Sequence, residues 1–225
     1  MLFRTSFLFV LPTVAFSATL PEVVVTASAG SLTVPSVQAA QADINATTAG
    51  AAEVVDSETW LRGRATTLRD ALDYAPGVFV QPRFGQEEAR LSIRGSGLQR
   101  TFHGRGIMLL QDGVPFNLSD GSFDFQAIDP LAARYIEVFR GANALEYGAT
   151  SLGGAINFVS LTGINAPPAD VRVTYGSFET LQLHASGGWS TDKVDGYASF
   201  TRYSTNGYRE HSQQEGRRLY TNLGY

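Results

Sequence analysis

The stretch 181–203, LQLHASGGWSTDKVDGYASFTRY, decides the fold class of this 225-residue chain. Apolar or aromatic residues alternate with other residues in two runs, 181–186 and 197–203. Gly187-Gly188 and Thr191-Asp192-Lys193 are the turn signals between them. Strands of about ten residues with this period and tight turns are typical of a membrane β-barrel. The alternative is the edge of a soluble antiparallel sheet, and periodicity alone does not separate the two.

The neighbouring sequence continues this pattern in both directions. Val171, Val173 and Tyr175 alternate with polar residues upstream, and the chain ends at Tyr225 in what we expect to be a fourth strand. Glycine is frequent, at 23 residues, and aromatic residues make up 11% of the chain. Together they favour tight turns and interfacial rings.

The first residues predict export. Met1-Leu2-Phe3-Arg4 gives a short positive region, residues 6–16 are almost wholly apolar, and Ala15-Phe16-Ser17 ends the run with small residues. This pattern is typical of a signal peptide, which we expect at residues 1–17. The alternative, a buried first strand, does not account for Arg4 or the small-residue end. Export and the tyrosines favour the membrane interpretation of the alternating strands.

Composition limits the possible chemistry. The chain has no cysteine, so it forms no disulfides and no cysteine metal site. Its net charge is -4, and no basic stripe suits nucleic acid. We find no nucleophile–base pair, metal cluster or phosphate loop, and therefore expect no enzyme activity, no cofactor and no metal site. Gly95-Ser96-Gly97 lacks the setting of a nucleotide motif, and Glu87-Glu88 is better explained as a solvated turn.

Between the export signal and the alternating strands lies a glycine-rich block that predicts a small α+β domain. We expect helices at 35–44, 57–61 and 68–74, with a short one at 129–133 that Asp129-Pro130 begins. Asp112-Gly113 predicts a hairpin, and Pro82–Gly85 a loop. The expected strands are 51–56, 78–81, 90–94, 107–110, 114–116, 135–140 and 153–159.

A strong strand former with no partner stands just behind the signal. It is Leu20-Pro21-Glu22-Val23-Val24-Val25-Thr26-Ala27. Such a segment suits lending its edge to the sheet of another protein. The alternative is a valine-rich terminus with no partner, and the eight residues by themselves favour neither.

Taken in order, these segments resemble the TonB-dependent outer-membrane receptors, in particular those for siderophores and ferric citrate. Leu20–Ala27 resembles their TonB box. Their plug domain is matched by six short segments in family order and spacing. These are 67–72 with Pro76-Gly77-Val78, Ile93-Arg94-Gly95, Leu110–Pro115, Ile136–Gly141, Ala144–Gly148 and Gly153–Asn157. Each motif alone is weak, and the series is a strong signal.

The resemblance implies roles for particular residues. Leu20, Pro21, Glu22, Val23, Val24, Val25, Thr26 and Ala27 would bind TonB. In the family two plug arginines pair with barrel glutamates, and the matching residues are Arg94 and Arg140; the alternative is an ordinary exposed arginine at a strand end. Plug loops facing outside meet the ligand, and the corresponding loops here are 82–85, 99–103 and 117–125. The residues implied are Arg83, Phe84, Arg100, Phe102, His103 and Phe123. A loop arginine is more often solvated, and a loop phenylalanine more often packs on the plug.

The fold class implied is an α+β plug domain followed by the first antiparallel strands of a transmembrane β-barrel. We expect a signal peptide at 1–17, the TonB box and linker at 18–32, the plug at 33–160 and barrel strands at 161–225. About four strands are present, whereas such barrels close with about 22, so we expect the chain to be part of a longer protein. Because the box follows the signal almost directly, we expect no N-terminal signalling domain.

The implied function is uptake of a scarce iron chelate, a ferric siderophore or ferric citrate, across the outer membrane of a Gram-negative bacterium. The implied partners are the periplasmic domain of TonB, the chelate and the membrane. Haem, cobalamin and metal-free substrates stay open. The alternative function is a periplasmic plug module that binds ligand or TonB without transport, or a decayed receptor fragment.

Overall fold

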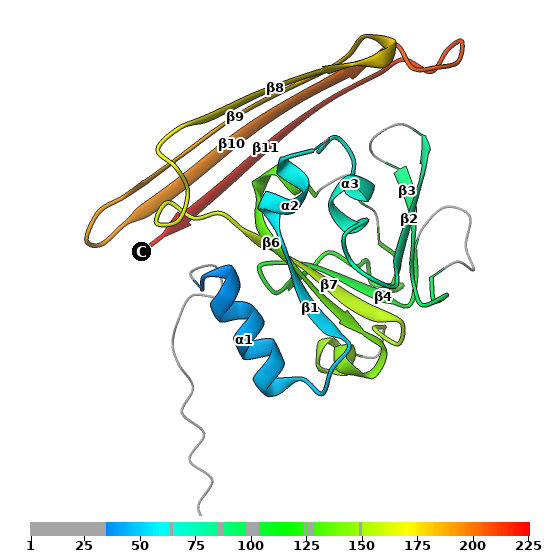
Figure 1. Ribbon diagram of the computed structural model, residues 1–225, viewed down its shortest axis with the longest axis vertical. Helices are drawn as coiled ribbons and strands as arrows, with labels where there is room; N and C mark the ends of the chain where they lie inside the picture. Colours follow the sequence, from blue (N-terminus) through cyan, green and yellow to red (C-terminus); the bar gives the residue numbers. More distant parts are fainter. Residues whose placement is uncertain are drawn as a thin grey trace, which may run out of the picture.

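The computed structural model describes residues 35–63, 65–84, 88–97, 104–123, 125, 128–148 and 150–225. Several predictions lie outside these residues: the signal peptide at 1–17, the segment Leu20–Ala27 with its linker, and the loop residues Arg100, Phe102 and His103. The side chain of Phe84 is also outside the description. The described residues contain three sheets, of five, four and two strands (Figure 1).

The five-stranded sheet forms the centre of an α+β domain. Its strands are β1 (Ala52–Asp56), β4 (Ile107–Gln111), β5 (Val114–Pro115), β6 (Ala133–Arg140) and β7 (Gly154–Ser160). Their order is β1-β6-β7-β4-β5, and all neighbours are antiparallel except β4 and β7. All seven residues of the central strand β7 are buried, as expected for a strand with both faces covered.

Helices cover the two faces of this sheet. The helices are α1 (Val37–Thr47), α2 (Ser57–Leu61) and α3 (Leu68–Leu72). Ile44 of α1 packs on one face with Phe139 and Ala155. Trp60 and Leu72, from α2 and α3, pack on the other face. Among the described residues, no helix is both long enough and apolar enough to cross a membrane.

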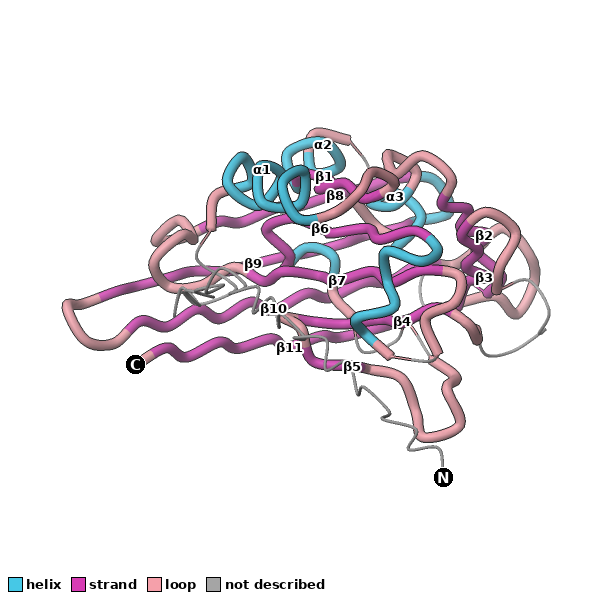
Figure 2. Tube along the Cα trace, turned by 90° about the horizontal axis from the view of Figure 1, so that it is seen from below, coloured by secondary structure: helices cyan, strands magenta, loops and turns pink. Residues whose placement is uncertain are grey.

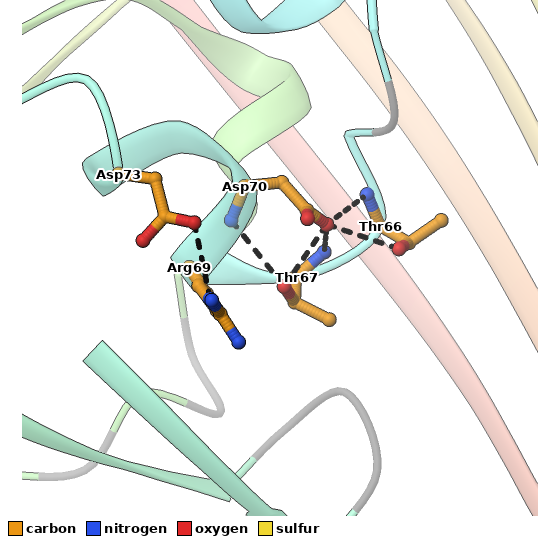
Figure 3. Close-up of polar contacts among 5 residues, drawn as sticks. All are labelled: Thr66, Thr67, Arg69, Asp70 and Asp73. Atoms are coloured by element: carbon orange, nitrogen blue, oxygen red, sulfur yellow. Dashed lines mark hydrogen bonds and ion pairs between the residues drawn. The ribbon is translucent and has the colours of Figure 1, made fainter.

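A capping box explains where α3 begins (Figure 3). The Asp70 Oδ2 atom accepts hydrogen bonds from the backbone nitrogens of Thr66 and Thr67, at 3.1 and 2.8 Å, and from both threonine hydroxyls. The Asp70 nitrogen donates back to the Thr67 hydroxyl oxygen. These bonds satisfy donors that the first helical turn leaves free. The helix ends at Leu72, two residues before the expected end at Tyr74.

Two short elements confirm predictions made from local signals. Asp112 and Gly113 adopt positive φ angles of 52° and 78° in the β4–β5 turn, the conformation that an Asp-Gly hairpin requires. The 3-10 helix η1 (Pro130–Ala132) begins at Asp129, whose carboxylate accepts from the Leu131 nitrogen. A longer 3-10 segment, η2 (Gly141–Tyr147), follows β6.

The prediction of a loop at Pro82–Gly85 is wrong for residues 82–84, which belong to a strand. Strand β2 (Val78–Phe84) continues through Pro82 and pairs with β3 (Glu88–Ile93) as the two-stranded sheet. The register shifts between Pro82 and Phe84. A proline fits there because an edge strand with an irregular ladder does not need every backbone donor.

The four-stranded sheet confirms the alternating strands. It contains β8 (Asp170–Gly176), β9 (Thr180–Ser190), β10 (Asp195–Thr205) and β11 (Gln214–Gly224), all antiparallel in the order β11-β10-β9-β8. It lies beside the α+β domain (Figures 1 and 2). The face toward that domain carries buried polar side chains, and the other face exposes apolar ones.

The turn expected at Gly187-Gly188 is wrong, because both glycines lie inside β9. Their role is to let the connection from the α+β domain pass close to the strand. The Gly188 nitrogen donates to the Pro167 carbonyl at 3.0 Å. A Cβ atom on Gly187 would lie 2.7 Å from the Pro168 carbonyl oxygen. The turn signal at Thr191-Asp192-Lys193 is confirmed, since β9 ends at Ser190 and β10 begins at Asp195.

Candidate functional site: the seam between the two sheets

The strongest described contact between the two parts of the molecule centres on Asp129. Its Oδ1 atom accepts from the Leu131 nitrogen at 3.1 Å and so caps η1. Its Oδ2 atom accepts from the Thr201 hydroxyl on β10 at 2.6 Å. Asp129 is 8% exposed and Thr201 1% exposed. One buried carboxylate therefore both starts a helix in the α+β domain and binds the four-stranded sheet.

His184 extends this contact by one residue. It lies opposite Thr201 in the β9–β10 pair, and its Nδ1 atom is 2.8 Å from the Thr201 hydroxyl oxygen. Because that hydroxyl donates its proton to Asp129, it accepts from the Nδ1–H of the histidine. The result is a buried chain of hydrogen bonds from His184 through Thr201 to Asp129, which we call the seam triad.

Beside the seam triad is a cavity of about 30 Å³, enough for a water molecule. Both parts of the molecule line it: Leu61, Gly63, Ala65 and Leu131 on one side, and Arg172, Thr174, Gln182 and His184 on the other. Two weaker bonds cross the seam at its edge, each 3.4 Å long. Arg172 donates to the Leu61 carbonyl and Gln182 to the Ala65 carbonyl.

A second crossing point lies at the β4–β5 turn. The Tyr220 hydroxyl on β11 donates to Asp112 Oδ2 at 3.1 Å. The other oxygen of Asp112 accepts from the Ser160 nitrogen at 2.7 Å. Asn157, in turn, accepts from the Gly113 nitrogen and donates to Glu137. The Gln111-Asp112-Gly113 motif thus fixes both a hairpin and its attachment to the neighbouring sheet.

The charge of Glu137 is unfavourable in this position. Burial raises the pKa of the Glu137 carboxyl, and the hydrogen bond from Asn157 opposes that rise. Burial likewise raises the pKa of Tyr135 to about 12. The packing of the α+β domain therefore shifts the pKa of both groups, and neither group belongs to the seam triad.

Arg140 binds groups inside its own domain. It is 6% exposed, forms an ion pair with Glu53 of β1, and donates through Nε to the Pro76 carbonyl at 2.7 Å. Arg94, with a φ of 50°, lies against the same turn, since its nitrogen donates to the Gly77 carbonyl. Among the described residues these partners of Arg140 belong to the α+β domain, and pairing of Arg94 or Arg140 with barrel glutamates stays a prediction.

Of the residues predicted to face a ligand, the structure describes the side chains of Arg83 and Phe123. Arg83 lies half-buried in β2. Phe123 is 2% exposed and belongs to the main hydrophobic core, where its ring meets Phe125 edge-on at 5.3 Å. For Phe123 the structure therefore supports the packing alternative over the ligand-facing role. Phe84, Arg100, Phe102 and His103 stay predictions, because their side chains are outside the described part.

Hydrogen bonds of the Asn117 side chain fix the start of the loop 117–125, which we expect to face outside. The Asn117 side chain accepts from the Leu109 nitrogen and donates to the carbonyls of Ile107 and Gly121. On its surface, Arg105 and Asp120 form an ion pair at 2.5 Å. Hydrogen bonding from Ser122, together with Arg105, holds the pKa of the Asp120 carboxyl well below its usual range.

The sequence does not identify the residues that join the α+β domain to the four-stranded sheet. It predicts Asp129 only as a helix cap, Thr201 and His184 only as members of alternating strands, and Tyr220 only as part of the expected fourth strand. The available signal is the polar character of the inward face, where Gln182 and His184 on one strand, and Ser199 and Thr201 on the next, stand two positions apart. Nothing local identifies their partners.

The α+β domain has helices on both faces of its sheet, and polar contacts join it to an antiparallel sheet with an apolar outer face. This arrangement is typical of plugged β-barrel proteins. Residues 45–155 match the family model described as the TonB-dependent Receptor Plug Domain. The chain is 29% identical over 154 residues to a hemin receptor of Yersinia enterocolitica, covering 65% of this chain and 22% of the receptor. It is also 29% identical over 147 residues to the vitamin B12 transporter BtuB of Vibrio vulnificus, covering 64% and 23%.

Among solved structures, the FrpB iron transporter of Neisseria meningitidis is similar with a TM-score of 0.60 at 18% identity, covering 76% of this chain and 28% of that protein. This likeness concerns the fold. The chain belongs to the TonB-dependent receptors, and it spans less than a quarter of the length of the two curated relatives. The predicted fold class, a plug domain followed by antiparallel barrel strands, is confirmed. The α+β domain is called the plug below, and β8–β11 the wall sheet.

Proposed function

We propose that this chain supplies the plug and the first wall strands of an outer-membrane receptor that takes up a scarce iron chelate, a ferric siderophore or ferric citrate. The observation that carries the proposal is the match of residues 45–155 to the plug family, together with the wall sheet that follows the plug in the chain. The names of the matched relatives include hemin and vitamin B12, so the choice of iron chelate is part of the proposal.

The wall sheet favours a membrane receptor over a periplasmic plug module. Its outer face exposes Val171, Val173, Leu219 and Leu223, each more than 60% exposed. A periplasmic protein would leave this apolar surface in water, whereas a barrel wall places it against lipid. We therefore propose the outer membrane of a Gram-negative bacterium as the location.

The proposed energy source is TonB, which would pair with Leu20–Ala27 by adding a strand to that segment. A pull from this end would reach β1 through α1, because both follow this segment along the chain. β1 is an edge strand of the plug sheet, paired on one side with β6. Its outer side is bound by the Gln41 side chain, which accepts from the Val54 nitrogen. We propose that this edge yields first and opens a passage for the chelate.

The proposed ligand contacts are the plug loops. Arg83, Arg100 and His103 would meet the negative charge of a ferric chelate, and Phe84 and Phe102 its aromatic rings. Arg94 and Arg140 keep their proposed pairing with barrel glutamates, in addition to the contacts they make inside the plug.

The test is the substitution Val24→Pro in the full-length receptor. Proline removes a backbone donor that an added strand needs, so we expect chelate uptake by cells to be abolished while chelate binding stays unchanged. Val24→Thr is the matched control, because threonine keeps the donor and the strand propensity. Uptake by Val24→Pro at the rate of the unaltered receptor would refute the assignment of the TonB box.

A further inference from the structure

The outer face of the wall sheet changes character along its length. From the turn between β9 and β10, the outward positions are mostly apolar: Trp189, Leu223, Phe200, Leu219, Val171, Val173 and Leu183. Toward the other end, the next outward positions on β10 and β11 are charged. Arg202 and Arg217 are 49% and 65% exposed there. On β10 and β11 the apolar positions thus end at Arg202 and Arg217, while β8 and β9 carry Val173 and Leu183 at the same level.

These two arginines stand directly opposite each other on neighbouring strands. Like charges in that arrangement repel, and a carboxylate relieves them only in part. Both guanidinium groups reach the same Oε1 atom of Glu215, at 3.0 and 3.1 Å. One negative charge therefore serves two positive ones. The trio keeps a net positive charge and several guanidinium donors that face outward.

Aromatic side chains lie beyond the arginines, where the strands end. Phe178 and Tyr208 are more than half exposed, and their ring centroids are 6.2 Å apart. The Arg209 guanidinium carbon is 5.0 Å from the Tyr208 ring centroid, a cation–π distance. The Asn206 nitrogen donates to the Phe178 carbonyl at 2.9 Å and fixes the two loops to each other. Aromatic rings in this position are typical of the girdle at a membrane interface.

We propose that Arg202 and Arg217 form a site for the phosphate of anionic membrane lipids, whose headgroups carry no compensating cation, on the outer surface of the barrel. This inference rests on the proposed membrane location. The site lies where the apolar positions of β10 and β11 end, below the aromatic rings Phe178 and Tyr208, from where long arginine side chains can extend to the lipid headgroups. It lies at the end of the β10–β11 connection, which is longer than the β9–β10 turn, and longer loops face the outside of such barrels. The lipids would therefore belong to the outer leaflet.

The chemistry of these two arginines suits phosphate. A guanidinium group offers paired donors that match two oxygens of a phosphate, and it is less strongly hydrated than an ammonium group. A phosphate placed between Arg202 and Arg217 would neutralise the charge that Glu215 leaves uncompensated. The lipid chains attached to it would continue along the apolar face below.

The experiment measures lipid retention by the purified full-length receptor in micelles that contain phosphatidylglycerol or phosphatidylcholine, with native mass spectrometry as the readout. We expect the receptor to retain phosphatidylglycerol in preference, and Arg202→Gln with Arg217→Gln to reduce that retention about 20-fold. The matched control, Arg62→Gln with Lys193→Gln, removes two exposed charges elsewhere and should leave retention unchanged. An equal loss in both double variants would overturn the proposal.

Two further measurements test the site independently of the double variant. Glu215→Gln frees both arginines and should raise phosphatidylglycerol retention several-fold, which tests the site if the double variant fails to fold. Inorganic phosphate should not displace the lipid at equal concentration; displacement would mean a site for free phosphate and overturn the lipid proposal. A receptor that retains lipid but shows no uptake dependent on Val24 refutes the proposed function alone. One that transports but does not discriminate lipids refutes this site alone.

Discussion

Arg140 of the plug and the pair Arg202 and Arg217 of the wall sheet lie in opposite surroundings. Arg140 of the plug is buried against Glu53 and the Pro76 carbonyl, and it joins strand β6 to β1. Arg202 and Arg217 of the wall sheet are exposed and share one carboxylate. The plug buries apolar side chains in its core, whereas the wall places polar side chains toward the plug and apolar ones on its outer face. Two adjoining sheets of one chain are therefore built for different surroundings.

This difference has a consequence for the contact between them. None of the hydrophobic clusters formed by the described residues includes a side chain of the wall sheet. The described residues of the two regions meet instead through hydrogen bonds, of which Asp129–Thr201 and Asp112–Tyr220 are the shortest side-chain crossings. Polar contacts can be exchanged for water with little net change in free energy. We therefore expect the plug to loosen without disrupting the wall.

The largest expected effect comes from breaking the charge pair inside the plug. Arg140→Met leaves Glu53 without its partner and the Pro76 carbonyl without its donor, and we expect a loss of about 3 kcal/mol in plug stability. Native-state hydrogen exchange of the full-length receptor measures it in peptides from β1 and β6, while peptides from β9 and β10 should not change.

The control for this prediction is the double variant Glu53→Gln with Arg140→Met. Removing both charges avoids an unpaired buried carboxylate, so most of the lost stability should return. If Arg140→Met slowed or preserved exchange in β1, the ion pair would not hold the edge of the plug.

A smaller effect is expected at the seam. Thr201→Val keeps the shape of the side chain but removes the donor to Asp129 and the acceptor for His184, which should cost about 1–2 kcal/mol. Because the plug core is untouched, the loss should appear in exchange of η1 and of the connection between plug and wall, with β7 unchanged. Thr201→Ser keeps the hydroxyl and should behave like the unaltered receptor. Faster exchange throughout the plug in Thr201→Val would contradict a separable seam.

Local signals were sufficient for much of the fold. The Asp-Gly pair at 112–113, the cap at Asp129 and the threonines before α3 each act on residues within a few positions, so their effects can be predicted from the sequence. Alternation identified the wall strands because each strand has one face toward the plug and one away from it. The turn predicted from Gly187-Gly188 is wrong, because a glycine pair can also permit another backbone segment to lie close to a strand.

The candidate site was less accessible to such reasoning. Thr201 lies 72 residues from Asp129, and Tyr220 lies 108 residues from Asp112. No local pattern states which polar residue on an inward face meets which carboxylate. Arg140 shows the same limit, since Glu53 is 87 positions away and belongs to a strand that becomes its neighbour only in the folded sheet.

The central claim is that the plug and the wall are separate cooperative units joined at a polar seam. The most direct measurement is hydrogen exchange of the full-length receptor in increasing, sub-denaturing urea, compared between β1–β6 and β9–β10 peptides. We predict that the plug peptides open at lower urea, with their own slope, before the wall peptides change. A single opening shared by both sets of peptides at the same urea concentration would contradict the account.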